Sequence, residues 1–270
     1  MFYMFSWFKN DIKMVCFDID NTLCDYMGAE AQTEAYIIEV IFKDIRKLQS
    51  KNRLRSKDSS GAISKFTLLR MLTDIKNSYV HKDLSPQHYS RELWFKELFE
   101  RSDLEMNLGI SMNSLIRDAK DYETKYWKYF DSRLKNYPNT LFTLETLKSS
   151  GLKLASVSDS DGKAGIKLGR IKVLGLDKYF DYNVTSDYTG ENKPAVSNWE
   201  LVLKLSGLKA KDCMMVGDHP DVDLVNAKKM GFRTVWTKEG IGMDLHYRFV
   251  DYEIKDIKEL IGIVEKINER

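Results

Sequence analysis

The stretch "MVCFDIDNTLCD" at residues 14–25 joins a short apolar run directly to two acidic residues. Met14 to Phe17 have the character of a buried β-strand, and Asp18 and Asp20 follow at once. If the strand continued, the two carboxylates would share one face and repel each other by about 4 kcal/mol at ~4 Å and an effective dielectric of 20. A divalent cation, a shared proton or a bend in the backbone would each relieve this repulsion, and each is commoner at active sites than in ordinary cores.

Length and composition are those of a globular protein with one large domain or two modest ones. The 270 residues are 43% hydrophobic, and 42 basic residues nearly balance 40 acidic ones. This balance argues against nucleic acid as the main partner, because there is no basic excess to neutralise phosphates. The three cysteines form no CxxC pair, which favours a reducing, cytoplasmic setting. The apolar start, residues 1–10, is shorter than a membrane span and lacks signal-peptide features, so we expect no membrane association.

Five short apolar runs predict the strands of a parallel β-sheet. They lie at residues 12–17, 152–157, 182–185, 213–216 and 233–236. Segments of helical character separate the later four, and helix-start and helix-end signals predict helices at 138–151, 197–207 and 221–231. Ser197 and Glu200 have the spacing of a capping box. This alternation is typical of an α/β protein with a Rossmann-like parallel sheet.

The region between the first two strands has a different, almost wholly helical pattern. Apolar residues repeat at helical spacing over 37–48 and 115–130, and Ser85 followed by Pro86 predicts the start of a further helix. We therefore divide the chain into an α/β core, residues 1–24 and 138–270, and an inserted all-helical cap, residues 25–137. The loops at 24–28 and 135–138 would be hinges, and we expect the cap to act as a mobile lid.

Polar residues gather where the predicted strands end. In open parallel sheets, ligands bind beyond the carboxyl ends of the strands. At this edge the sequence predicts Asp18, Asp20, Ser158, Asp159, Lys193, Asp218 and Asp223. Such a set suits magnesium-assisted phosphoryl transfer, because it offers oxygen ligands for a hard cation, a carboxylate nucleophile and groups that hold phosphate oxygens.

Four segments resemble, in order and spacing, the motifs of the haloacid dehalogenase superfamily. They are DIDNT at 18–22, SVSD at 156–159, NKP at 192–194 and VGDHPDVDLVNAKKMGFRTVW at 216–236. The helical insert lies where that family has its cap domain. The last segment, together with GLKLASVSDSD at 151–161, looks most like archaeal phosphatases of sugar phosphates and of glyceraldehyde 3-phosphate.

The resemblance implies a role for each residue. Asp18 would be the nucleophile that forms an aspartyl-phosphate, and Asp20 would protonate the leaving oxygen and then activate water. The carboxylates of Asp18 and Asp218 and the backbone carbonyl of Asp20 would bind Mg²⁺. The remaining residues would be Ser158, Asp159 and Lys193 at the phosphate, with Thr22 and Asp223 in support. His219, which is unusual within the fourth motif, is interpreted as a loop residue.

We expect a Mg²⁺-dependent phosphatase of small phosphorylated metabolites, such as sugar or polyol phosphates. Asp20 favours phosphate chemistry, because the dehalogenating members of the superfamily lack an acid at this position. Two alternatives remain: a phosphomutase or phosphotransferase, which returns the phosphoryl group to a sugar, and a binding module without turnover. Substrate selectivity would lie in the cap, whose candidate anion-binding residues are Lys65, Arg70, Arg91 and Arg133.

Overall fold

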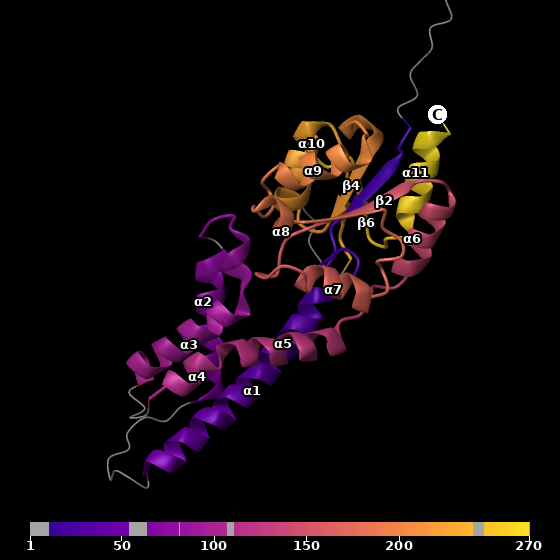
Figure 1. Cartoon of the computed structure of the whole chain (residues 1–270). Coiled ribbons are helices and arrows are strands. Elements are labelled where there is room, and N and C mark those ends of the chain that lie inside the picture. Colours follow the sequence, from indigo (N-terminus) through magenta and orange to yellow (C-terminus); the bar gives the residue numbers. More distant parts are fainter. Residues whose placement is uncertain (1–10, 54–63, 81, 107–110, 240–245, 270) are drawn as a thin grey trace, which may run out of the picture. The chain divides into compact units, whose positions relative to one another are not determined.

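The chain forms two compact units (Figure 1). The computed structural model describes residues 11–53, 64–80, 82–106, 111–239 and 246–269, so the expectation for residues 1–10 lies outside the described residues. The α/β unit comprises the chain up to Asp25, Lys135–Asp159 and the chain from Lys167 onward. The helical unit comprises Tyr26–Leu134 and a second, short segment, Ser160–Ile166.

The α/β unit is built on a six-stranded parallel sheet with the strand order β3-β2-β1-β4-β5-β6. The strands are β1 (Met14–Phe17), β2 (Lys153–Ser158), β3 (Tyr182–Thr185), β4 (Cys213–Gly217), β5 (Arg233–Thr237) and β6 (Tyr252–Ile254). The order matches that of Rossmann-type sheets, which confirms the predicted fold class. Among the described residues β6 is the strand that the sequence did not predict, because it has only three residues.

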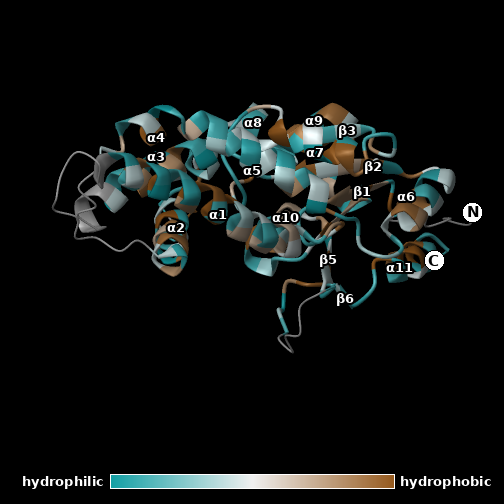
Figure 2. Cartoon of the chain, turned by 90° about the horizontal axis from the view of Figure 1, so that it is seen from below, coloured by the Kyte–Doolittle hydropathy of each residue, from teal (hydrophilic) through white to brown (hydrophobic). Residues whose placement is uncertain are grey.

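Helices cover both faces of this sheet. Figure 1 shows α9 (Ser197–Ser206) and α10 (Val225–Met230) on one face and α6 (Thr140–Ser149) and α11 (Glu259–Asn268) on the other. Figure 2 shows apolar and polar residues on different sides of α6 and α11, as expected of helices that bury one face. The central strand β1 is buried along its whole length. The carboxyl ends of β1, β2 and β4 therefore project from a rigid core.

Two of the predicted helix starts need correction. The capping box expected at Ser197 is not formed, because α9 begins at Ser197 itself and Val196 occupies the N-cap position. The helix expected over 221–231 begins later, since a π-helical turn, η3 (Pro220–Leu224), precedes α10. The remaining helices after β2 are α7 (Ile166–Val173) and α8 (Ser186–Thr189).

All regular elements in the described residues of the insert are helices. Its elements are α1 (Tyr26–Arg53), α2 (Lys65–Val80), η1 (Pro86–Tyr89), α3 (Arg91–Met106), α4 (Asn113–Arg117) and α5 (Ala119–Arg133). The helix predicted to start at Ser85 is interrupted, because Pro86 opens the 3₁₀ turn η1 and the extended backbone at Ser90 separates η1 from α3. Helix α5 packs against both α1 and α3. Within the described ranges, no helix combines the length and apolar character needed to cross a membrane.

The segment Ser160–Ile166, which links β2 to α7, groups with the helical unit. Gly162 in this segment lies so close to Ser90 that an added Cβ would stand 2.1 Å from the Ser90 backbone nitrogen. The ammonium group of Lys163 forms an ion pair with Glu92 at 2.7 Å. The division of the chain at residue 137 did not anticipate this, because a loop that follows a strand carries no helical pattern.

Candidate active site

The two acidic residues that follow β1 do not lie on a common strand face. The strand ends at Phe17, and the chain turns at Asn21, which has a positive φ of 56°. Asparagine adopts this left-handed conformation more readily than most residues. Asp18 and Asp20 therefore point to different cationic partners. Of the three ways to relieve their repulsion, the described residues display a bend in the backbone. Separate countercharges, which the sequence analysis did not consider, add to it.

Asp18 lies at the centre of a buried ion-pair network. The Lys193 ammonium donates to Asp18 Oδ1 and to Asp223 Oδ1, each at 2.6 Å. The Thr22 hydroxyl donates to Asp18 Oδ2 at 3.1 Å. Burial raises the pKa of Asp18 to about 7; the attraction of Lys193 opposes this shift, and the charges of Asp223 and Asp20 add to it. The positive charge of Lys193 therefore does not fully balance an ionised Asp18 in this position.

Asp218 completes a cluster of three acids at the ends of β1 and β4. Carboxylate oxygens of Asp18, Asp218 and Asp223 all lie within 4.8 Å of one another. Burial, followed by the charges of Asp223 and Asp18, holds the pKa of Asp218 well above its usual value. The indole N–H of Trp236 donates to the Asp218 backbone oxygen at 2.9 Å and fixes the loop. These oxygen ligands fit a hard cation such as Mg²⁺, whose charge would relieve their repulsion.

Asp223 is held in place by the close packing of the turn after β4. The backbone N–H of His219 donates to Asp223 Oδ2 at 3.0 Å, so this histidine contributes its backbone to the loop. Gly217 leaves room for the acid, because a Cβ on this glycine would stand 2.5 Å from the Cβ of Asp223. The structure thus brings Asp223 to Lys193.

Ser158 and Asp159, which end β2, differ in what their side chains contact. The Ser158 hydroxyl is buried and has no hydrogen-bond partner among the described residues. Such a hydroxyl is available to a ligand oxygen. The Asp159 carboxylate accepts the backbone N–H of Lys193 at 2.7 Å. This carboxylate already accepts a hydrogen bond from Lys193, and its charge would repel an anion. A phosphate contact from Asp159 would therefore have to come from its backbone N–H.

Two cations that the sequence analysis did not single out hold Asp20. The Lys167 ammonium binds Asp20 Oδ2, and the Arg170 guanidinium binds Asp20 Oδ1 at 2.7 Å. Both cations are buried on α7. Although burial alone would raise the pKa of Asp20, Arg170 and Lys167 hold it well below its usual value. The signal available in the sequence was a pair of basic residues three positions apart on the helix that follows β2.

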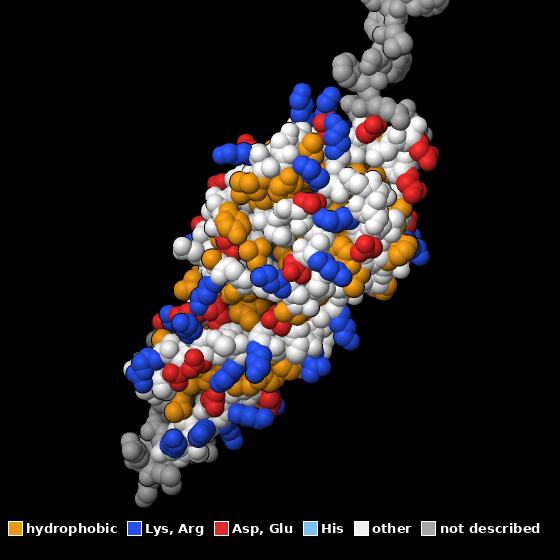
Figure 3. Space-filling view, turned by 45° about the vertical axis from the view of Figure 1, so that its right-hand side comes forward, with side chains coloured by type: hydrophobic (Ala, Val, Ile, Leu, Met, Phe, Trp, Pro, Cys, Tyr) orange, Lys and Arg blue, Asp and Glu red, His pale blue; other side chains and the backbone are white. Residues whose placement is uncertain are grey.

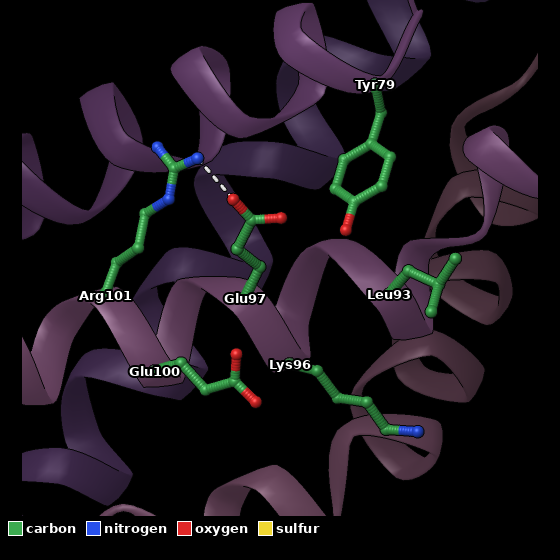
Figure 4. Close-up of a pocket in the computed structure, with 6 residues that line it drawn as sticks. All are labelled: Tyr79, Leu93, Lys96, Glu97, Glu100 and Arg101. Carbon is green, nitrogen blue, oxygen red and sulfur yellow. Dashed lines mark hydrogen bonds and ion pairs between the residues drawn. The ribbon is translucent and has the colours of Figure 1, made fainter. Parts of the chain in front are cut away.

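A hollow on the helical unit contains none of these residues. It has a volume of about 440 Å³ and is lined by Tyr79, Leu93, Lys96, Glu97, Glu100 and Arg101 (Figure 4). Arg101 pairs with Glu97, one turn earlier on α3, and Lys96 pairs with Glu92. Because both of its basic residues are paired and it contains none of the motif residues, this hollow is not a candidate active site.

The candidate anion-binding residues of the insert also have partners. Lys65 pairs with Glu39, and Arg70 pairs with Asp74 at 3.4 Å. The Arg91 guanidinium is buried and lies 4.2 Å from the ring centroid of Trp94, which indicates a structural role. The Arg133 guanidinium lies 4.9 Å from the Tyr129 ring centroid. On the face drawn in Figure 3, acidic and basic side chains are interspersed and neither sign dominates.

A Rossmann-like sheet with clustered carboxylates and a buried lysine at its carboxyl edge is the arrangement of an α/β enzyme. The model of the haloacid dehalogenase-like hydrolase family matches residues 12–231. The chain therefore belongs to this family. The match covers every predicted site residue, from Asp18 to Asp223.

Several known proteins resemble the chain over most of its length. It is 30% identical to a glyceraldehyde 3-phosphate phosphatase of Methanocaldococcus jannaschii over 192 residues, which cover 61% of this chain and 83% of the relative. It is 28% identical to a glyceraldehyde 3-phosphate phosphatase of Pyrococcus furiosus, with 95% of each chain covered. The crystal structure of a phosphatase of the same superfamily from Thermococcus onnurineus superposes with a TM-score of 0.66 at 24% identity, covering 94% of this chain and 98% of that chain. This last likeness concerns the fold.

Proposed function

We propose that the protein is a Mg²⁺-dependent phosphatase that hydrolyses small phosphorylated metabolites through an aspartyl-phosphate. The observation that carries this proposal is the buried contact between the Lys193 ammonium and Asp18, beside the available hydroxyl of Ser158. A carboxylate nucleophile, a cation and a hydroxyl donor are what a phosphoryl group needs at one place. The activities for which the relatives are named support the same class of reaction.

In the first half-reaction, a carboxylate oxygen of Asp18 attacks the phosphorus and the bond to the leaving oxygen breaks. Lys193 and Ser158 hold the phosphate oxygens while charge builds on them. Asp20 gives its proton to the leaving oxygen, which departs as an alcohol. For this step the Asp20 carboxylate must first take up a proton and so release at least one of its two cations.

In the second half-reaction, Asp20 accepts a proton from water, and the water oxygen attacks the phosphorus of the aspartyl-phosphate. The bond between phosphorus and the Asp18 oxygen breaks, which frees inorganic phosphate and restores both aspartates. Lys167 and Arg170 favour the ionised state of Asp20 that this step requires.

Asp18, Asp218 and the backbone carbonyl of Asp20 are the groups that we propose to hold Mg²⁺, with Asp223 in support through Lys193. The bound ion would supply positive charge to the phosphate oxygens and to the acid cluster. The fit rests on the three crowded carboxylates, of which Asp18 and Asp223 pair with Lys193.

We further propose a sugar or polyol phosphate as substrate, on the strength of the named activity of the relatives. A cytoplasmic setting belongs to the same proposal. It is supported by the three cysteines, which are free thiols and buried.

The test is release of phosphate from p-nitrophenyl phosphate with and without Mg²⁺, followed by a panel of sugar, polyol and nucleotide phosphates. We expect Mg²⁺-dependent turnover that Asp18→Asn abolishes, because enzymes speed phosphate monoester hydrolysis by up to ~10²¹ and no neighbour can replace the nucleophile. Activity of Asp18→Asn within tenfold of the wild-type rate would refute the proposal. A phosphomutase would differ by a stable phosphoenzyme and by its need for a bisphosphate activator.

A further inference from the structure

We propose that Lys167 and Arg170 are positioning residues that hold the carboxylate of Asp20 for its work on the aspartyl-phosphate. This inference rests on the proposed phosphatase function, since it assigns how one of the reacting groups of that site is aligned. Neither cation lies in any of the four motif segments.

The geometry of the contact is that of a clamp with one cation on each carboxylate oxygen. Arg170 Nη1 stands 2.7 Å from Oδ1 of Asp20, and Lys167 Nζ binds Oδ2. Two separate attachment points fix both the position of the carboxylate and the rotation of its plane. Both cations come from α7 and are almost fully buried, whereas the side chain of Asp20 is 22% exposed. The holders are therefore more rigid than the group that they hold.

Asp20 needs such support because it lies beyond the end of β1, next to the left-handed residue Asn21. Its backbone forms an isolated bridge with Cys24, which leaves the direction of the side chain to its own contacts. In the second half-reaction, one proton passes from water to Asp20, the water oxygen bonds to phosphorus, and the bond from phosphorus to Asp18 breaks. If the Asp20 carboxylate turned away from the attacking water, it could not accept this proton. General acid–base catalysis of this kind contributes typically ~10²–10⁴-fold to the rate.

The clamp lies directly after a segment of the helical unit in the sequence. Lys167 directly follows Ser160–Ile166, the segment that belongs to the helical unit. Within that unit, Lys163 pairs with Glu92 and with Glu123. The clamp residues thus begin, along the chain, where this segment of the helical unit ends.

The first experiment compares Lys167→Gln and Arg170→Gln with Lys172→Gln, an exposed lysine of the same helix. The substrate is p-nitrophenyl phosphate, whose good leaving group needs little protonation, so kcat/KM reports formation of the phosphoenzyme and kcat its hydrolysis. We expect the clamp variants to lose at least about tenfold in kcat, with kcat/KM changed by less than about threefold. A stoichiometric burst of p-nitrophenolate should appear. Lys172→Gln should behave as wild type.

The second experiment is a double-mutant cycle in the Asp20→Asn background. If the cations act through Asp20, Lys167→Gln should cost nothing further in kcat once Asp20 is changed. Multiplied losses in the double variant would overturn the inference, as would clamp variants that match Lys172→Gln or that lose kcat/KM as much as kcat. Lys167→Arg and Arg170→Lys keep a cation within reach and should retain intermediate activity; they serve if the glutamine variants do not fold.

These outcomes separate the clamp from the proposed function. Wild-type protein that releases no phosphate from p-nitrophenyl phosphate in Mg²⁺ would refute the phosphatase itself. An active wild type whose clamp variants behave like the control would refute only the role of Lys167 and Arg170.

Discussion

The contact of Gly162 with Ser90 can be tested by one added methyl group. Gly162 has a φ of 90°, and a Cβ placed on it would lie 2.1 Å from Ser90 N and 2.4 Å from Tyr89 C. These are backbone atoms, which cannot rotate away as the end of a side chain can. Gly165 has a φ of 88°, but nothing lies within 4 Å of the Cβ that it would carry. Gly165→Ala is therefore a matched control for Gly162→Ala.

Both variants carry the free-energy cost of a left-handed backbone, but only Gly162→Ala also carries the cost of steric overlap with Ser90. A left-handed conformation costs an alanine roughly 1–2 kcal/mol, and this applies equally at φ values of 90° and 88°. In Gly162→Ala the segment must also retreat until the contact lengthens from 2.1 Å to the 3.4 Å at which ordinary contact begins. Because overpacking typically costs about 1–3 kcal/mol, the free energy of unfolding should fall by that much more in Gly162→Ala than in the control.

The same retreat should disturb the chemistry, since Ser158 precedes the segment and Lys167 follows it. Urea unfolding and steady-state kinetics with p-nitrophenyl phosphate, run on both variants, measure the two effects. We expect Gly162→Ala to lose more stability and more kcat than Gly165→Ala. Equal losses in stability would mean that the close approach to Ser90 contributes nothing beyond the backbone conformation. A stability loss with unchanged kcat would confine its effect to the helical unit.

The acid cluster leads to three further expectations. Asp218→Asn should raise the melting temperature in EDTA, because burial and the charges of Asp223 and Asp18 make the ionised Asp218 unfavourable. The rise should be roughly 2–4 °C for each kcal/mol gained in the free energy of unfolding. An unchanged or lower melting temperature would contradict this. Gly217→Ala should push Asp223 away from Lys193 and lower kcat by roughly 10²-fold, as expected of a ~1 Å misplacement, so a wild-type rate would rule out the packing argument. Turnover should require Mg²⁺ and be inhibited by Ca²⁺, which prefers more ligands at longer distances, whereas equal rates in EDTA would exclude a metal role.

The strands and their order of appearance could be predicted because each central strand is an unbroken apolar run bounded by polar residues. β1 and β4 are buried along their whole length, which is the pattern that a parallel sheet imposes. β6 (Tyr252–Ile254) was not predicted because an edge strand of three residues, of which only Ile254 is buried, leaves no periodic signal. The late start of α10 was not predicted for another reason. The turn η3 has residue types that are typical of a helix, but its backbone is π-helical.

The gathering of Asp18, Lys193 and Asp218 could also be predicted, since the carboxyl ends of parallel strands meet at one edge. The partners of Asp20 could not. Lys167 lies 147 positions and Arg170 150 positions from Asp20 along the chain, and such pairing leaves no local trace in the sequence. The predicted repulsion between the two acids assumed a strand that continues past Phe17, where the structure has a turn.

Two identical side chains, separated by a single residue, therefore occupy opposite electrostatic environments. Burial and neighbouring acids raise the pKa of Asp18 to about 7, whereas Arg170 and Lys167 hold that of Asp20 well below its usual value. Taken without a cation, this ordering would make Asp20 the better-ionised group and leave the proposed nucleophile partly protonated at neutral pH. A bound cation inverts local pKa logic, because its charge favours the ionised form of each carboxylate beside it. The proposed dependence on Mg²⁺ should consequently arise at Asp18 and its neighbour Asp218, whereas α7 itself supplies the countercharge of Asp20.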